Sequence, residues 1–175
     1  MKRTLAAPRI LAAALAFALP CALFAQKAVF VVRHAEKASE ANDASVPLSS
    51  AGTARAERLA ALLKNSGVSA IYSTDTVRTR KTAEPLAAAR KLDIGIYNPT
   101  GPDGKVSLTA LAEKLKRENS SDVVLVVGHS NTIAPLLTAL GCGAESVPIA
   151  GEDYDNLFVV VPQGGSPPLL LRLRY

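Results

Sequence analysis

The chain has 175 residues, 49% of them apolar, and its 20 lysine and arginine residues stand against 15 aspartate and glutamate residues. This length suits one compact domain, and the mixture of apolar and charged residues excludes a disordered chain and a membrane protein with several spans. Two cysteines are too few for a disulfide framework, and no paired Cys-X-X-Cys motifs indicate structural zinc.

The first 25 residues have the pattern of a secretory signal peptide. The apolar run 10–19 is preceded by the basic residues Lys2, Arg3 and Arg9, and the segment ends at the small residue Ala25. We expect cleavage after Ala25 and a periplasmic or secreted protein, with residues 26–175 forming a single domain. The apolar run is too short to span a bilayer comfortably, so no stable membrane insertion is expected after removal of the signal.

Cleavage would change both the charge and the cysteine content of the chain. The remaining residues carry 17 basic and 15 acidic side chains, and Cys142 stays as the one cysteine. Lipidation at Cys21 would need a small residue before it, but Pro20 is there. Because no stripe of basic and aromatic side chains follows residue 25, nucleic acid is not an expected partner.

Apolar strand patterns alternate with helical ones along the rest of the chain. We expect strands at 28–32, 68–72, 94–97, 123–127, 157–161 and 169–173. The helices are expected after Ser49 or Ser50 until Gly67, over 76–90, along 108–115, and along 133–140 with Pro135 in or near the first turn. Pro/Gly-rich loops are expected at 98–104 and 162–168.

This alternation predicts an α/β fold of three layers. The central sheet would be mainly parallel, with right-handed crossovers that place helices on both faces, and the last two strands can pair antiparallel.

Both histidines of the chain directly follow apolar strands. His34 follows Arg33 at the end of the first strand, and His129 follows Gly128 at the end of the fourth. Ligands of open α/β sheets bind at the carboxyl ends of the strands, so both imidazoles meet in one crevice if these strands are neighbours. Each histidine taken alone is better explained as a side chain that packs against or caps a strand end.

Two histidines beside an arginine indicate an anion site. Zinc prefers three or more ligands, and a guanidinium opposes cation binding, so no metal and no cofactor are expected. The arginine fork matches the oxygens of a phosphate. A neutral imidazole can attack phosphorus and form a covalent phosphohistidine, while the surrounding positive charge stabilises the transferring group.

Three motifs resemble the histidine phosphatase superfamily, in the branch of phosphoglycerate mutase-like proteins. Arg33-His34-Ala35-Glu36 is similar to its RHG signature, with Ala35 in place of glycine. Residues 73–83 resemble its second arginine block, which selects Arg78 because Thr82-Ala83 follow it, and residues 127–130 resemble its second histidine motif. The resemblance covers essentially all of residues 26–175.

The resemblance implies a role for each of these side chains. His34 would be the phosphorylated nucleophile, and Arg33, Arg78 and His129 would form the phosphate pocket. Taken without the motif, Arg78 belongs to a basic cluster that would ordinarily be a solvated helix face. Glu36 either supports the site through a hydrogen bond to arginine or histidine, or forms a salt bridge of the loop.

Other charged residues are not assigned to the chemistry. Arg80 faces away from Arg78 because residues two apart on a helix point in different directions. Asp103 is the sole carboxylate between the third strand and the next helix, and a Pro-Asp-Gly turn explains it without a role as proton donor. Residues 153–156 lack the spaced ligands of a calcium loop and are interpreted as a turn before a strand.

These observations favour an exported, metal-independent phosphatase that acts on a small phosphorylated substrate through phospho-His34. The short loop 98–107 offers little cover over the pocket, which favours hydrolysis over a mutase-like phosphotransfer. The alternatives are a binding module that captures a phosphorylated ligand without turnover, and an envelope scaffold without activity. The sequence leaves the substrate, the proton donor and the oligomeric state open.

Overall fold

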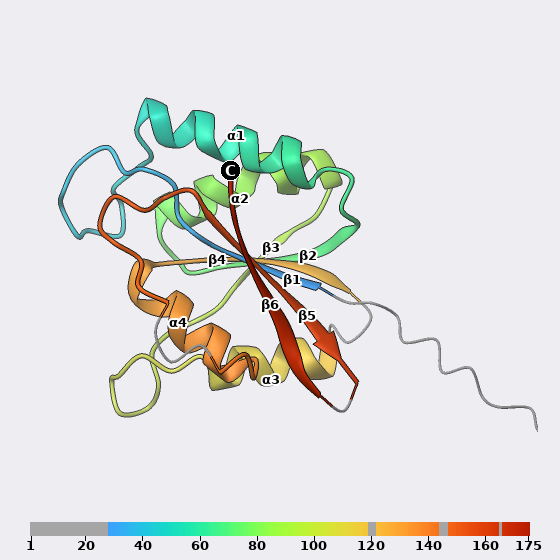
Figure 1. The fold of residues 1–175 in the computed structure, drawn as a ribbon. Coiled ribbons are helices and arrows are strands. Elements are labelled where there is room, and N and C mark those ends of the chain that lie inside the picture. The colour runs from blue at the N-terminus through green and yellow to red at the C-terminus, as the bar shows by residue number, and fades with distance from the viewer. Residues whose placement is uncertain (1–27, 119–121, 144–146, 165) are drawn as a thin grey trace, which may run out of the picture.

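The computed structural model describes residues 28–118, 122–143, 147–164 and 166–175, so the predicted signal peptide and Cys21 lie outside the described residues. The described residues form one six-stranded sheet and four helices (Figure 1). The strands are β1 (Ala28–Arg33), β2 (Val68–Ser73), β3 (Ile94–Ile96), β4 (Val123–Gly128), β5 (Asn156–Gln163) and β6 (Ser166–Arg174). The helices are α1 (Ser50–Leu63), α2 (Val77–Arg90), α3 (Thr109–Glu118) and α4 (Ser130–Ala139).

The sheet has the strand order β3-β2-β4-β1-β5-β6. Strands β1 to β4 pair in parallel, because each is joined to the next through a helix that crosses one face. Strand β5 runs antiparallel to both β1 and β6. The prediction of a mainly parallel sheet with an antiparallel final pair is therefore confirmed.

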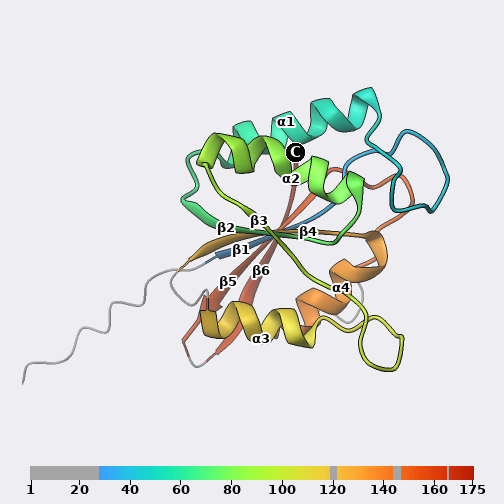
Figure 2. The ribbon, with the colours of Figure 1, turned by 180° about the vertical axis from the view of Figure 1, so that it is seen from behind.

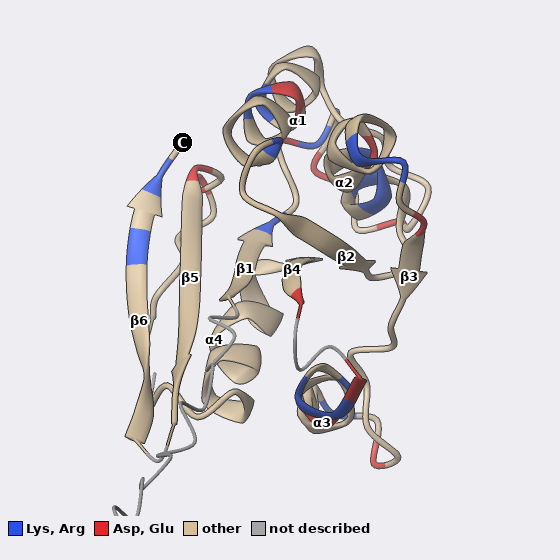
Figure 3. Cartoon of the chain, turned by 90° about the vertical axis from the view of Figure 1, so that its right-hand side faces the viewer, with Lys and Arg blue, Asp and Glu red and all other residues tan. Residues whose placement is uncertain are grey.

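The helices cover both faces of the sheet, as the three-layer prediction requires (Figures 1 and 2). Along β1, Val29 and Val31 are buried in the core beneath α3 and α4, whereas Val32 is buried in the core beneath α1 and α2. This alternation places apolar side chains in both cores, which explains why the strand reads as a continuous apolar run. Figure 3 shows that charged residues lie mainly on the helices and at strand ends.

The start of α1 agrees with the capping pattern in the sequence. Ser49 is the N-cap, and its Oγ accepts a hydrogen bond from the backbone N–H of Gly52 at 3.1 Å. A Cβ atom on Gly52 would lie 2.1 Å from the carbonyl oxygen of Glu36. This position therefore needs glycine, and the close approach holds α1 against the loop that follows β1.

Two features of the structure involve proline. Pro135 is the sixth residue of α4, close to its first turn, and because it has no N–H, the carbonyl of Asn131 lacks the usual helical partner. The predicted bounds of the loop 162–168 were wrong, because strands β5 and β6 extend into it and leave a tighter turn between them. Pro167 and Pro168 are tolerated there because β6 is an edge strand.

Within the described ranges, none of the helices combines the length and the apolar character that a membrane crossing requires.

Candidate active site

The topology brings the two histidines together. Strands β1 and β4 are direct neighbours, with Arg33 opposite Gly128 in the parallel register. The backbone N–H of His34 donates to the carbonyl oxygen of Gly128 at 2.9 Å, and the ring centroids of His34 and His129 are 5.3 Å apart. The sequence predicted that both imidazoles meet in one crevice if these two strands are neighbours, and the strands are neighbours.

Close packing fixes the end of β4. A Cβ atom on Gly128 would lie 2.6 Å from Oγ1 of Thr132 and 2.9 Å from the hydroxyl of Tyr97. Thr132 Oγ1 in turn accepts the backbone N–H of His129 at 2.8 Å. The glycine therefore allows α4 to begin directly beside the sheet, with His129 at its N-terminus.

A polar cavity of about 430 Å³ opens at this end of the sheet. Its lining residues come from β1 and its following loop, from α2, and from the start of α4. They are Arg33, His34, Lys37, Asn42, Arg78, His129, Ser130 and Asn131. None of these lining residues is a carboxylate, so the cavity offers cations and neutral hydrogen-bonding groups to an anion.

His34 is held as a neutral imidazole with a free Nε2. Its Nδ1 lies 2.8 Å from the carbonyl oxygen of Ala35, and because a carbonyl only accepts, Nδ1 carries the hydrogen. Burial above all, opposed by that hydrogen bond and assisted by the charges of His129 and Arg33, lowers the pKa of His34 to about 3. At neutral pH, Nε2 therefore has its lone pair available as a nucleophile.

His129 is oriented by a threonine at the carboxyl end of β2. Its Nε2 lies 2.9 Å from Oγ1 of Thr74, which also donates to Oγ1 of Thr79 at 3.0 Å. Burial, followed by the charges of Arg78 and Arg33, lowers the pKa of His129 to about 4. Both histidines are thus neutral, and the positive charge of the cavity belongs to arginine and lysine.

Arg33 is fixed from the far side of the cavity by the segment before β5. Its Nη1 donates to the carbonyl oxygens of Ala150 and Gly151 at 3.1 and 2.8 Å, and its guanidinium lies 4.0 Å from the ring centroid of Tyr154. Its Nε is buried and has no hydrogen-bond partner among the described residues.

Arg78, near the start of α2, is held in a similar way. Its Nη1 donates to the carbonyl oxygen of Asp43 at 2.8 Å, while its Nε is buried without a partner in the described part of the chain. Burial and the nearby charge of Arg33 lower the pKa of Arg78 from its ordinary high value. Two guanidinium groups that repel each other across one cavity are the arrangement that a bound phosphate would relieve.

The structure places three other candidate residues away from the cavity. Glu36 receives hydrogen bonds from Arg55, with Oε1 at 2.6 Å from Nη2, so it is the salt-bridge partner within a loop rather than a contact of the site. Arg80 pairs with Asp75 on the exposed side of α2. Asp103 accepts the backbone N–H of Lys105, as the turn interpretation expected.

Sequence reasoning missed several side chains of the site. Lys37, Asn42, Ser130 and Asn131 line the cavity, and Tyr154 stacks on Arg33. The two residues after His129 could have been found, because the N-terminus of a helix that begins at the crevice faces the ligand. No pattern in the sequence indicates Tyr154, since it reaches the site through the loop before β5, the strand that pairs with β1.

In the described part of the chain, no group of three or more histidine, cysteine, aspartate or glutamate residues could hold a metal ion. Cys142 is half-buried beyond the end of α4, where burial raises the pKa of its thiol.

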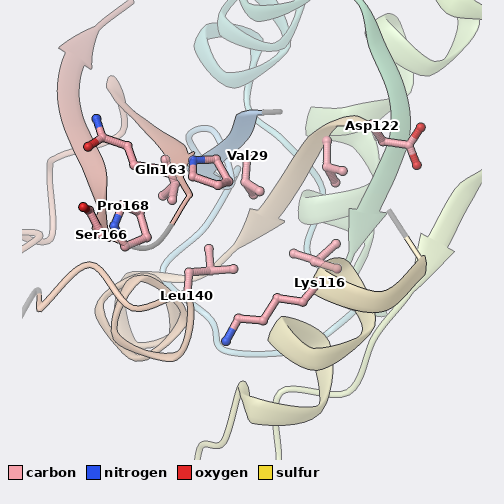
Figure 4. Close-up of a pocket in the computed structure, with 11 residues that line it drawn as sticks. Val29, Lys116, Asp122, Leu140, Gln163, Ser166 and Pro168 are labelled. Atoms are coloured by element: carbon pink, nitrogen blue, oxygen red, sulfur yellow. The ribbon is translucent and has the colours of Figure 1, made fainter. Parts of the chain in front are cut away.

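A second cavity of about 300 Å³ lies at the opposite end of the sheet (Figure 4). Aliphatic side chains such as Val29, Leu140 and Pro168 form most of its wall. Its charged residues are engaged, because Lys116 donates to the carbonyl of Ala139 and Asp122 accepts from Ser69. It offers no arrangement comparable to the polar cavity.

Comparison with known proteins supports the motif resemblance. The sequence profile of the histidine phosphatase superfamily (branch 1) matches residues 29–98, a range that contains Arg33, His34 and Arg78. None of the curated proteins compared with the chain matches it.

Solved structures share the fold at low sequence identity. The protein histidine phosphatase SixA complexed with tungstate is 20% identical, with a TM-score of 0.66 over 84% of this chain and 96% of that one. A mycobacterial glucosyl-3-phosphoglycerate phosphatase is 16% identical, with a TM-score of 0.62 over 86% and 98%. Phosphoserine phosphatase from Entamoeba histolytica is 15% identical, with a TM-score of 0.62 over 85% and 97%. At these identities the likeness concerns the fold.

Proposed function

We propose that this chain, which belongs to the histidine phosphatase superfamily (branch 1), is a phosphatase that hydrolyses a phosphoester or another phosphoryl compound through a covalent phosphohistidine on His34. The observation that carries the proposal is the neutral, buried His34, whose Nδ1–H is committed to Ala35 and whose Nε2 is left for the cavity. Phosphatase activity in the structural neighbours SixA and the mycobacterial enzyme supports the same class of reaction.

In the first step, Nε2 of His34 attacks phosphorus. The new P–N bond forms as the P–O bond to the leaving group breaks, and the bonding pair stays with the leaving oxygen, which takes up a proton. Arg33 and Arg78 donate hydrogen bonds to the equatorial oxygens, where negative charge must be stabilised. His129, held by Thr74, lies beside the nucleophile, with the two ring centroids 5.3 Å apart.

In the second step, water attacks the phosphohistidine. The P–N bond breaks, inorganic phosphate leaves, and Nε2 regains its lone pair. Hydrolysis is favoured over mutase-like transfer because the loop between β3 and α3 is short, and the antiparallel bridge between Thr100 and Val106 folds it on itself.

The absence of a carboxylate among the cavity residues bears on the leaving group. General acid catalysis ordinarily contributes about 100-fold or more to the departure of a basic alkoxide. A leaving group of low basicity needs less of this help. The same feature keeps the alternative of a binding module that captures a phosphorylated ligand without turnover.

Hydrolysis of para-nitrophenyl phosphate, with rapid quenching after mixing, separates these alternatives. A phosphatase of this kind gives turnover and a protein adduct that survives alkali but not acid, and both disappear in His34→Ala and His34→Gln. A binding module gives phosphate affinity with neither turnover nor adduct. Circular dichroism of each variant checks that the fold is retained, and a His34 variant that is folded and fully active would refute the proposed nucleophile.

We also propose that the protein is exported and cleaved after Ala25. The pattern of residues 1–25 supports this proposal. Expression of the full chain in a bacterial host, followed by fractionation and mass measurement, tests it. A periplasmic product that begins at Gln26 supports it, and an uncleaved cytoplasmic product contradicts it.

A further inference from the structure

We propose that Lys37 determines substrate specificity by binding a second anionic group on the leaving part of the substrate. The phosphatase would then prefer phosphoryl compounds that carry a further carboxylate or phosphate near the scissile bond. This inference rests on the proposed function, since it assumes that Arg33 and Arg78 receive the phosphoryl group.

The Lys37 side chain is half-buried at the cavity, and its charge has only weak compensation nearby. Its side chain is only 12% exposed, and it lines the same cavity as the two arginines. Its Nζ lies 3.4 Å from the carbonyl oxygen of Ala41 and 3.4 Å from a carboxylate oxygen of Glu40, both long for a hydrogen bond. The Glu40 side chain is 98% exposed, so water screens this ion pair strongly.

The loop after β1 places Lys37 and Arg78 along one wall. Nζ of Lys37 reaches the carbonyl of Ala41, the next residue Asn42 lines the cavity, and the carbonyl of Asp43 accepts from Arg78. The five residues from Lys37 to Ala41 thus fold back toward the cavity. A substrate whose phosphoryl group faces Arg78 therefore has its leaving group within reach of the same wall.

Charge balance favours a substrate with more than one anionic group. A phosphate monoester dianion matches the two guanidinium groups of Arg33 and Arg78. Lys37 adds a third cation, and its ion-pair partner Glu40 is exposed to solvent and does not line the cavity. A neutral leaving group would remove water from the ammonium without replacing its hydrogen bonds, which is costly. A second anionic group would supply them.

The start of α4 adds to this preference from the other wall. Ser130 and Asn131 line the cavity at the first two positions of this ten-residue helix. Backbone N–H groups at a helix N-terminus favour negative charge. The cavity therefore presents hydrogen-bond donors on both walls beyond the phosphoryl position.

Binding of stable phosphonates tests the inference without requiring turnover. Phosphonopropionate and propylphosphonate have similar shapes, but phosphonopropionate ends in a carboxylate and propylphosphonate ends in a methyl group. Ethylene bisphosphonate offers a second phosphonate in place of the carboxylate. Titration calorimetry measures the dissociation constant of each compound for the purified protein, for Lys37→Met and Lys37→Gln, and for Lys64→Met as a matched control. Lys64 is the C-cap of α1, at the opposite end of the sheet from the cavity. Its replacement removes the same charge as the Lys37 variants do, but away from the cavity.

The wild-type protein should bind at least one of the two compounds with an anionic tail about tenfold more tightly than propylphosphonate, equivalent to one well-placed charged contact. In both Lys37 variants the ratio of the two dissociation constants should fall toward one, whatever the general loss of anion affinity, while Lys64→Met keeps the wild-type ratio. The inference is overturned if the wild type shows no preference or if the preference survives in folded Lys37 variants. Absence of any phosphonate binding, together with absence of turnover, would instead refute the phosphate site itself and with it the proposed function.

Discussion

Mild acidification should destabilise this protein through its two histidines. The chain contains no others, and both lie in the cavity with a pKa well below the ordinary value, about 3 for His34 and about 4 for His129. In the unfolded chain both imidazoles titrate near pH 6.5. Between these values the unfolded state binds protons that the folded state does not, so stability falls as the pH is lowered.

The size of the effect follows from these values. Between about pH 7.5 and 5.5, an unfolded imidazole gains nearly a full proton while folded His34 stays neutral, which costs about 1.4 kcal/mol. His129 is only half-buried, so solvent screening reduces its share. The expected loss of unfolding free energy is therefore about 2 kcal/mol over this range, and it is fully recovered above the pH at which unfolded histidine titrates.

Urea denaturation at the two pH values, followed by circular dichroism, measures this loss. The carboxylates with lowered pKa, such as Glu36 and Asp153, stay deprotonated throughout this range and contribute little to the change in unfolding free energy. The double variant His34→Gln/His129→Gln is the control, because glutamine does not titrate. Its unfolding free energy should change by less than about 0.5 kcal/mol between the two values.

A wild-type protein that is equally stable at both pH values would refute the argument that burial keeps the histidines neutral. The same conclusion follows if the glutamine double variant shows the full loss, because groups other than these two imidazoles would then be responsible.

Three further changes should have separable effects. Arg55→Met breaks the hydrogen bonds to Glu36 and should lower the unfolding free energy by about 2 kcal/mol in urea titrations. The kcat of the folded protein should not change. A loss of kcat without a loss of stability would place Glu36 in the chemistry. Thr74→Val removes the hydrogen bond to His129 and should lower kcat by roughly tenfold with KM little changed. Thr74→Ser should keep kcat near the wild-type value. Steady-state kinetics of the two variants measure both constants. Dialysis against a chelator should leave turnover of para-nitrophenyl phosphate unchanged, and recovery of activity only on adding a divalent metal would contradict the metal-independent mechanism.

The parallel part of the fold could be predicted because its signals are local. Strands β1 and β4 are mostly continuous apolar runs, and a histidine directly follows each of them, so the position of His34 and His129 at one sheet edge follows from topology. The layer assignment needed only the alternation of strands and helices. Ser49 shows that a helix start can also be found from a single side chain.

The rest of the site depends on contacts between distant segments. Tyr154 reaches Arg33 only because β5 pairs with β1, which carries the preceding loop to the cavity. The sequence allowed Glu36 either to contact the site or to form a salt bridge of the loop. It pairs with Arg55 because α1 packs against the loop after β1. Lys37 turns inward because the loop up to Pro47 folds back and bonds to Ala38. Loop paths of this kind leave no periodic pattern.

The central place of β1 has a consequence for the order in which the cavity is assembled. This strand carries Arg33, but the two strands that flank it come much later in the chain. Val29 pairs with Val124 on one side and with Val160 on the other. Such long-range pairing makes folding slow and dependent on most of the chain. During synthesis, a nascent chain that has not yet reached β4 and β5 cannot bring Arg33 and His34 together with His129 and Tyr154, so the polar cavity is complete only after β5 has been made.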